Sequence, residues 1–323
     1  MKKYLITGFS GFVSRHFLEF LDAQGIRASV LGIDANAPTV DASRFRGVTC
    51  RFEQLSLTNE LRTQEVVKAF QPDVVLHLAA HSSVQYSWKN PAQSFRNNTT
   101  IFLNLIEAIR LLHSDVRILS VGSSEEYGDV SNKDLPLRED HILRPVSPYA
   151  VARVSQEMLS RVYVSSYGMD IVSTRSFNHI GPGQSEVFVA SSFARQIAAA
   201  SKAGLSNLAM KTGDLSIVRD FTDVRDVVRA YHLLLLKGRK GEVYNVCSGQ
   251  GIPLSDFLLK MSQKAGIKIT QTTDPALVRP SDNRAIIGSN EKISAETGWR
   301  PEIPLDRSLG DILLDWKVRL GNG

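Results

Sequence analysis

The sequence of 323 residues has little cysteine and no long hydrophobic run. Its two cysteines, Cys50 and Cys247, lie far apart without Cys-x-x-Cys spacing, so neither a disulfide framework nor a zinc site is predicted, and no metal is expected. No segment approaches the roughly 20 apolar residues of a membrane span, and the apolar run after Met1 stops at Gly8, too soon for a secretion signal. These absences favour a protein of the reducing cytoplasm, without a membrane partner.

Clusters of charge of one sign are also missing. The 38 Lys and Arg residues exceed the 33 Asp and Glu residues by five, but they are scattered along the chain. Nucleic acid is therefore not an expected partner. With 43% hydrophobic and 22% charged residues, the composition is that of a globular protein with one large domain or two interdependent ones, a size that suits an enzyme.

Short apolar segments alternate with helical patterns through the first half of the chain. The segments typical of strands are 4–6, 28–33, 73–78, 116–121 and 170–175, and helical spacing recurs at 61–70, 92–112 and 149–167. Such alternation predicts an α/β fold, a doubly wound parallel sheet of the Rossmann type. We expect at least six parallel strands.

After about residue 178 the alternation loosens, and a smaller α/β C-terminal lobe is expected there. A helix near 191–202 and a tail punctuated by prolines belong to this lobe. A helix over 223–236 and a strand over 242–246 are expected to return to the main sheet. The two lobes therefore interleave along the chain.

Gly8, Gly11 and Ser14 stand at the spacing of a Gly-x-x-Gly-x-x-Gly turn between the first expected strand and helix. Small residues there let backbone N–H groups approach a pyrophosphate at a helix N-terminus, although the same spacing also suits a purely structural turn. Asp34 ends the second strand, where a carboxylate bonds the adenosine ribose and favours NAD over NADP. Its alternative role is that of a turn former.

A Ser-Pro dipeptide starts the third helical pattern, and Tyr149 and Arg153 follow four residues apart on one helix face. A phenol acts as a general acid or base only if a nearby cation lowers its pKa, near 10 when unperturbed, and Arg153 supplies such a charge. The same spacing is common in ordinary helices. Ser123 and Ser124 follow the strand over 116–121, at the sheet edge where open α/β sheets place ligands; their alternative role is a helix or turn cap.

Four ordered motifs carry a resemblance to a known family: TGFSGFV at 7–13, HLAA at 77–80, SSEEYG at 123–128 and SPY at 147–149. Together they resemble the extended short-chain dehydrogenase/reductase family over essentially the whole chain. Within that family, RSFNHIGPGQ at 175–184, RDFTDV at 219–224 and RPSD at 279–282 are most similar to GDP-6-deoxy-4-keto-mannose reductases. The GDP-mannose 4,6-dehydratases are close relatives of those reductases.

The resemblance implies roles for individual residues. Ser123, Tyr149 and Arg153 occupy the catalytic Ser/Thr, Tyr and Lys positions, and Glu125 the position of the dehydratase glutamate. NAD(P)H is the implied cofactor, with contacts from Gly8, Ser10, Gly11, Phe12, Val13, Asp34, Leu78, Ala79, Ala80 and Asn98. Substrate contacts are implied for Ser124, Asn178, Val189, Arg219 and Arg279. The guanidinium groups of the two arginines suit a diphosphate.

The implied reaction is reduction of the C4 ketone of a GDP-linked 4-keto-6-deoxyhexose, giving a GDP-6-deoxyhexose such as GDP-rhamnose. Three alternative functions stay open. Glu125 allows a GDP-mannose 4,6-dehydratase that recycles its NAD(P), and the others are an epimerase and a dinucleotide-binding sensor without turnover. The chain departs from the family pattern at three places. Arg153 stands where the family usually has the catalytic Lys. Ser56 stands in place of the Asp that contacts adenine, and Ser14 stands in place of the third glycine of the turn.

The same resemblance implies a domain division and an assembly. Residues 1–178 with 217–247 form the NAD(P)-binding domain, and residues 179–216 with 248–323 the nucleotide-sugar-binding lobe. Two helices, near 91–112 and 149–167, correspond to a pair that commonly forms a four-helix bundle across a dimer in this family. We therefore expect a homodimer.

Overall fold

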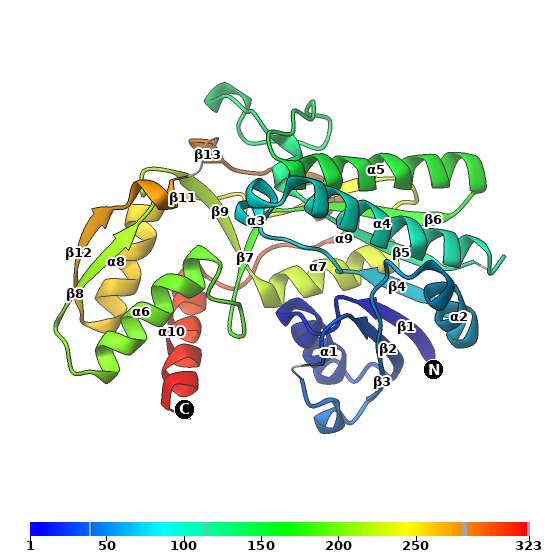
Figure 1. The fold of residues 1–323 in the computed structure, drawn as a ribbon, viewed down its shortest axis with the longest axis horizontal. Coiled ribbons are helices and arrows are strands. Elements are labelled where there is room, and N and C mark those ends of the chain that lie inside the picture. Colours follow the sequence, from blue (N-terminus) through cyan, green and yellow to red (C-terminus); the bar gives the residue numbers. More distant parts are fainter. Residues whose placement is uncertain (39, 114, 279–282, 322–323) are drawn as a thin grey trace.

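A parallel sheet forms the main body of the computed structural model, which describes residues 1–38, 40–113, 115–278 and 283–321. Within the described residues the sheet has seven strands in the order β10-β6-β5-β4-β1-β2-β3, and every neighbouring pair is parallel (Figure 1). The predicted doubly wound α/β fold is thereby confirmed. The strands are β1 Lys2–Thr7, β2 Ala28–Asp34, β3 Val48–Gln54, β4 Val74–His77, β5 Arg117–Ser123, β6 Asp170–Ser176 and β10 Val243–Val246.

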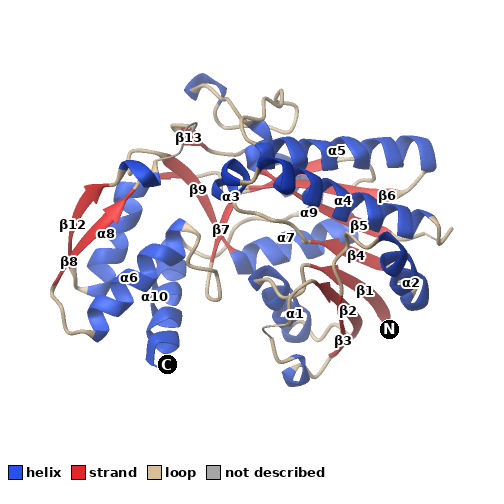
Figure 2. Ribbon diagram, in the orientation of Figure 1, coloured by secondary structure: helices blue, strands red, loops and turns tan. Residues whose placement is uncertain are grey.

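Helices cover both faces of this sheet (Figure 2). Helices α1, α7 and α9 pack on one face, and α2, α4 and α5 on the other. Because the central strands are buried on both sides, their sequences are apolar runs without alternation. No helix of the described ranges is long and apolar enough to cross a membrane. The helices are α1 Phe12–Ala23, α2 Glu60–Phe70, α3 Val84–Lys89, α4 Pro91–Arg110, α5 Pro148–Tyr167, α7 Val224–Lys237 and α9 Glu291–Thr297.

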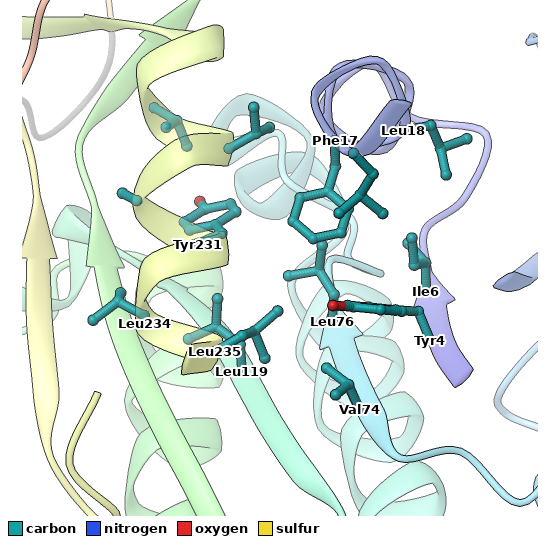
Figure 3. Close-up of a cluster of buried hydrophobic side chains, with 14 of the residues drawn as sticks. Tyr4, Ile6, Phe17, Leu18, Val74, Leu76, Leu119, Tyr231, Leu234 and Leu235 are labelled. Carbon is teal, nitrogen blue, oxygen red and sulfur yellow. The ribbon is translucent and has the colours of Figure 1, made fainter. Parts of the chain in front are cut away.

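Helix α7 returns from the smaller lobe to the main sheet, as its apolar pattern predicts. Figure 3 shows Tyr231, Leu234 and Leu235 projecting from α7 into the cluster that also holds Phe17 of α1 and Leu76 of β4. All five side chains are buried. Strand β10, which follows α7, pairs with β6 and forms one edge of the sheet. The expected return of both elements is therefore confirmed.

The smaller lobe lies at the left of Figure 1 and has a core of its own, in which Phe193, Phe257 and Leu309 are buried. Strand β9 belongs to its four-stranded sheet, whereas α7 directly after it packs on the main sheet. The domain division itself stays a prediction. The elements of this lobe are β7 Asn178–Ile180, α6 Val189–Lys202, β8 Asn207–Thr212, β9 Val218–Asp223, β11 Gly251–Pro253, α8 Leu254–Ala265, β12 Lys268–Thr273, β13 Ala285–Ile286 and α10 Leu305–Gly321.

Candidate active site

One large cavity joins the carboxyl ends of the main strands to the smaller lobe. Its volume is about 1850 Å³, and it is lined from the main sheet by the turn after β1 and from the smaller lobe by α6 and β9. Pockets for single small molecules usually measure roughly 300–1,000 Å³. The cavity therefore has room for a dinucleotide and a second large molecule.

The turn after β1 leaves a helix N-terminus open to this cavity. Gly8 has a φ of 70°, and a Cβ there would lie 2.8 Å from the backbone nitrogen of Ala79. Gly11 is the N-cap of α1, with no capping side chain and no acidic residue in the first turn. The first N–H groups of α1 and its dipole are thus available to an anion. Of the predicted cofactor residues, this turn brings Gly8, Ser10, Gly11, Phe12 and Val13 to the cavity wall.

Asp34 is fixed at the end of β2, beside this turn. Its Oδ2 accepts the backbone N–H of Ser10 at 3.0 Å, and its Oδ1 accepts that of Asn36 at 2.9 Å. The Ser10 hydroxyl donates to the Asn36 carbonyl at 2.8 Å and closes the turn. The carboxylate lines the cavity, so its remaining lone pairs can accept hydrogen bonds from a ribose.

The loop after β4 contributes Leu78, Ala79 and Ala80 to the cavity wall. Asn98, predicted to contact the cofactor, does not line the cavity. It is buried in α4, where its Oδ1 accepts the His81 N–H at 2.8 Å and its Nδ2 donates to the His81 carbonyl at 3.3 Å. Asn98 therefore holds the loop that carries Leu78, Ala79 and Ala80 in place through the His81 backbone.

Tyr149 and Arg153 meet on the first turns of α5. The helix begins as predicted, with the Ser147 hydroxyl accepting the Ala150 N–H at 3.1 Å and Pro148 in the first turn. Nε of Arg153 donates to the Tyr149 hydroxyl at 3.1 Å, and the guanidinium carbon lies 5.2 Å from the centre of the tyrosine ring. Both side chains line the cavity. A phenol with an adjacent cation is therefore available for proton transfer.

Ser123 ends β5, and Ser124 and Glu125 begin the short 3-10 helix that follows. All three line the cavity. The Ser123 hydroxyl accepts the Glu125 N–H at 3.2 Å, and the Ser123 N–H donates to Oε1 of Glu126 at 2.7 Å. Ser123 thus caps the 3-10 helix, which is the alternative role expected from the sequence. Because its hydroxyl oxygen accepts this bond, the hydroxyl proton is still available to donate into the cavity.

Behind Ser123 lies a buried charged network that the sequence did not reveal. Arg175 of β6 donates from Nε and Nη2 to the two carboxylate oxygens of Glu157, both at 2.8 Å. Burial works to raise the pKa of Glu157, but Arg175 outweighs it and the pKa lies below its ordinary value. Burial and the neighbouring Glu157 raise the pKa of Glu126. The serine turn therefore rests on a fixed ion pair beside a carboxyl group that favours its neutral form.

The Arg175–Glu157 pair yields a stability prediction. Arg175→Met is expected to lower the free energy of unfolding by about 3–5 kcal/mol, because it leaves a buried carboxylate without its main partner. The control is Arg161→Met, which removes a second cationic partner of Glu157. The Arg161 side chain is 50% exposed, against 2% for Arg175, so a change of at most about 1 kcal/mol is expected. Urea denaturation measures both, and equal losses would contradict the prediction.

The smaller lobe supplies the remaining predicted contacts. Asn178, Val189 and Arg219 line the cavity, as does Ser124 across from them. Nη1 of Arg219 donates to the carbonyls of Val218 and Asn283, both at 2.9 Å. Arg279 lies outside the described residues. Five further cations of the described residues line the wall and were not predicted, because none stands in a motif that was recognised: Arg15, Lys89, Lys211, Arg284 and Arg319.

The sequence profile of the family described as GDP-mannose 4,6 dehydratase matches residues 5–312 of this chain. The chain belongs to this family. The resemblance to extended short-chain dehydrogenases/reductases is thereby confirmed. Among curated members of this group, the chain is 34% identical to the GDP-6-deoxy-D-mannose reductase of Pseudomonas aeruginosa, over 99% of this chain and 98% of that protein. It is 27% identical to the GDP-mannose 4,6-dehydratase of Yersinia enterocolitica, over 97% of this chain and 93% of that protein.

Solved structures of nucleotide-sugar enzymes are also similar to this chain. The structure of RMD from Pseudomonas aeruginosa complexed with NADPH has a TM-score of 0.84 and 31% identity, covering 99% of this chain and 98% of that one. The structure of UDP-glucose 4-epimerase from Thermotoga maritima with UDP-glucose has a TM-score of 0.85 and 26% identity, covering 99% of this chain and 100% of that one. Proteins similar to this chain thus include reductases, dehydratases and epimerases, so the reaction has to be argued from the site.

Proposed function

We propose that this protein reduces the C4 ketone of GDP-4-keto-6-deoxy-mannose with NAD(P)H, giving a GDP-6-deoxyhexose such as GDP-rhamnose. The observation that carries the proposal is that one cavity holds both the open N-terminus of α1 and the Ser123, Tyr149 and Arg153 side chains. The similarity to a GDP-6-deoxy-D-mannose reductase over nearly the whole chain supports the same reaction.

Each residue of the site has a defined task in this reaction. When bound, the nicotinamide supplies the hydride that C4 accepts. Tyr149 donates its phenolic proton to the C4 oxygen, so the C=O bond gains one hydride and one proton and becomes an alcohol. Ser123 donates a hydrogen bond to that oxygen and polarises the carbonyl. Arg153 stabilises the phenolate that remains, through its Nε on the Tyr149 hydroxyl.

The decisive experiment mixes the purified protein with GDP-4-keto-6-deoxy-mannose and NADH or NADPH, and follows nicotinamide absorbance. We expect stoichiometric consumption of the reduced cofactor. NMR of the product then gives the configuration at C4 and names the sugar. If the absorbance does not change with either cofactor while GDP-mannose is turned over, the reductase assignment is wrong.

The dehydratase is the second candidate, and Glu125 is the observation that favours it. This carboxylate lies in the cavity wall two residues after Ser123, where it could remove the C5 proton of the sugar. A dehydratase converts GDP-mannose to a 4-keto sugar without added cofactor, because the hydride is returned within each cycle. Formation of that ketone by the wild type, and its loss in Glu125→Gln, would transfer the assignment to dehydration.

The carboxylate of Asp34 yields a prediction about the cofactor. We expect kcat/KM to be higher with NADH than with NADPH, because Asp34 bonds ribose hydroxyls and repels a 2′-phosphate. Asp34→Ala is expected to lower kcat/KM for NADH about tenfold, the worth of one charged hydrogen bond, without a similar loss for NADPH. Steady-state kinetics with both cofactors measure the ratio. A ratio unchanged by the substitution would show that Asp34 does not select the cofactor.

We propose a homodimer formed through α4 and α5. These helices pack against each other on one face of the sheet (Figure 1). They expose the large apolar side chains of Phe95, Leu103, Val151, Met158 and Val162. Exposed apolar side chains gathered on two adjacent helices are typical of a protein interface.

The proposed dimer predicts a change of mass on substitution. Val162 is 49% exposed, and Val162→Glu places a charge among the apolar side chains, so a monomer is expected. Leu314→Glu is the control, because Leu314 is also apolar and is 62% exposed, but it lies on α10 in the other lobe. Size-exclusion chromatography with light scattering measures both masses. A monomeric wild type would refute the interface.

We further propose that the protein works in the cytoplasm. Cys50 and Cys247 are both free thiols. A chain without disulfides matches a reducing compartment, where NAD(P)H is also available.

A further inference from the structure

Arg153 is a buried cation whose partners are all neutral. Its Nε donates to the Tyr149 hydroxyl, and its Nη1 donates to the Val121 carbonyl at 3.3 Å and to Oε1 of Gln156 at 2.6 Å. Across the described part of the chain, no carboxylate lies within ion-pair distance of this guanidinium. Since a buried charge is costly without compensation, these dipoles hold the cation in place.

Gln156 is the side chain that fixes the guanidinium from the side opposite Tyr149. It is 2% exposed, and its Nε2 donates to the Ser120 hydroxyl at 2.8 Å and to the Val121 carbonyl at 3.1 Å. A carbonyl only accepts hydrogen bonds, so the amide is oriented with Oε1 toward Arg153. Every polar atom of the Gln156 amide is therefore engaged, and the arginine cannot turn without breaking this chain of bonds.

We propose that Gln156 is a positioning residue for the reduction proposed above: its neutral amide aims Nε of Arg153 at the Tyr149 hydroxyl and leaves the positive charge uncancelled. Arginine has a planar fork of donors, unlike lysine, so its direction has to be fixed. A carboxylate in this place would hold the fork equally well but would offset its charge. The choice of an amide thus preserves the full effect of the cation on the phenol.

Two other ionisable groups near Arg153, His77 and Tyr231, are neutral near neutral pH. Burial, aided by Arg153, lowers the pKa of His77 on β4 to about 3. Burial raises the pKa of Tyr231 on α7 well above its ordinary value. Glu125 is the carboxylate that lines the cavity beside Ser123. Tyr149 is the ionisable group to which Nε of Arg153 donates, so a charge added at position 156 is expected to act on this phenol.

The test compares Gln156→Leu, Gln156→Glu and Ser160→Ala by kcat, KM and the pH dependence of NAD(P)H oxidation. Gln156→Leu is expected to lower kcat at least about tenfold with KM for the sugar nucleotide unchanged, because the guanidinium is no longer aimed. Gln156→Glu is expected to move the alkaline fall to higher pH, because the added negative charge favours the protonated phenol. Ser160→Ala is expected to match the wild type, since the Ser160 hydroxyl contacts Ser120 at 3.4 Å and the backbone carbonyl of Gln156 at 2.9 Å, but neither Arg153 nor the Gln156 amide.

The outcomes separate this proposal from the proposed function. A wild type that does not consume NAD(P)H overturns both. An active wild type whose kcat persists in Gln156→Leu and whose alkaline fall is unmoved in Gln156→Glu overturns the positioning role alone. Because glutamate has nearly the shape of glutamine, Gln156→Glu keeps the test decisive even if Gln156→Leu fails to fold, which thermal unfolding followed by circular dichroism reveals.

Discussion

Tyr149→Phe is expected to lower kcat for ketone reduction at least about a hundredfold, the usual scale of acid–base catalysis, while the protein remains folded. The substitution removes the hydroxyl that carries the transferred proton and leaves the ring, which is buried in α5. Arg153 keeps its bonds to Val121 and Gln156, so the local structure has little reason to change. NAD(P)H oxidation measures kcat, and circular dichroism checks the fold.

A matched control lies on the same helix. Tyr167→Phe removes a hydroxyl at the exposed end of α5, away from the cavity, and no change in kcat is expected. Full activity in Tyr149→Phe would mean that another group donates the proton. Water or Ser123 would then be the group to examine.

Arg153 supports the second large prediction. Arg153→Lys is expected to retain activity, because an ammonium still places a positive charge beside the phenol. Arg153→Met is expected to abolish activity, because it keeps an apolar stem but removes the charge and leaves Oε1 of Gln156 without its donor. The rates of NAD(P)H oxidation by the wild type and both variants decide the matter.

The two substitutions also test each other. If the three proteins react equally fast, the cation is irrelevant and the arginine serves only to fill space. If both variants are inactive while folded, the planar fork is needed in addition to the charge. That result would strengthen the role assigned to Gln156, since a fork has a direction and a lysine ammonium does not.

The sequence predicted the central strands of the sheet and its β10 edge, but not the opposite edge, which is formed by β3. Strands β1 and β4 are buried apolar runs, whereas β3, which no pattern indicated, carries Arg51 and Glu53 on an edge where one side is open. Polar residues are tolerated there because fewer side-chain positions face the core. No pattern indicated β9 either, because its sequence VRDFTD mixes charged and apolar residues and does not state which sheet it joins.

Candidate site residues within one element were predictable, and those that depend on tertiary contacts were not. Tyr149 and Arg153 are four residues apart on a helix, so their contact follows from helical geometry. The pairing of Arg175 with Glu157 joins residues of a strand and a helix, and each alone looks like a surface charge. Asn98, for which the resemblance implied a cofactor contact, binds the backbone of His81, a contact between a helix and a loop that no spacing in the sequence indicates.

The return of the chain to its first sheet has a consequence during synthesis on the ribosome. Helix α7 and strand β10, residues 224–246, emerge long after β1 to β6 and after part of the smaller lobe has been made. Until then the face that holds Tyr4, Leu76 and Leu119 lacks the cover that Tyr231 and its neighbours provide (Figure 3). A nascent chain therefore exposes this apolar surface to chaperones and to other nascent chains, although its dinucleotide turn and proposed catalytic residues are already complete.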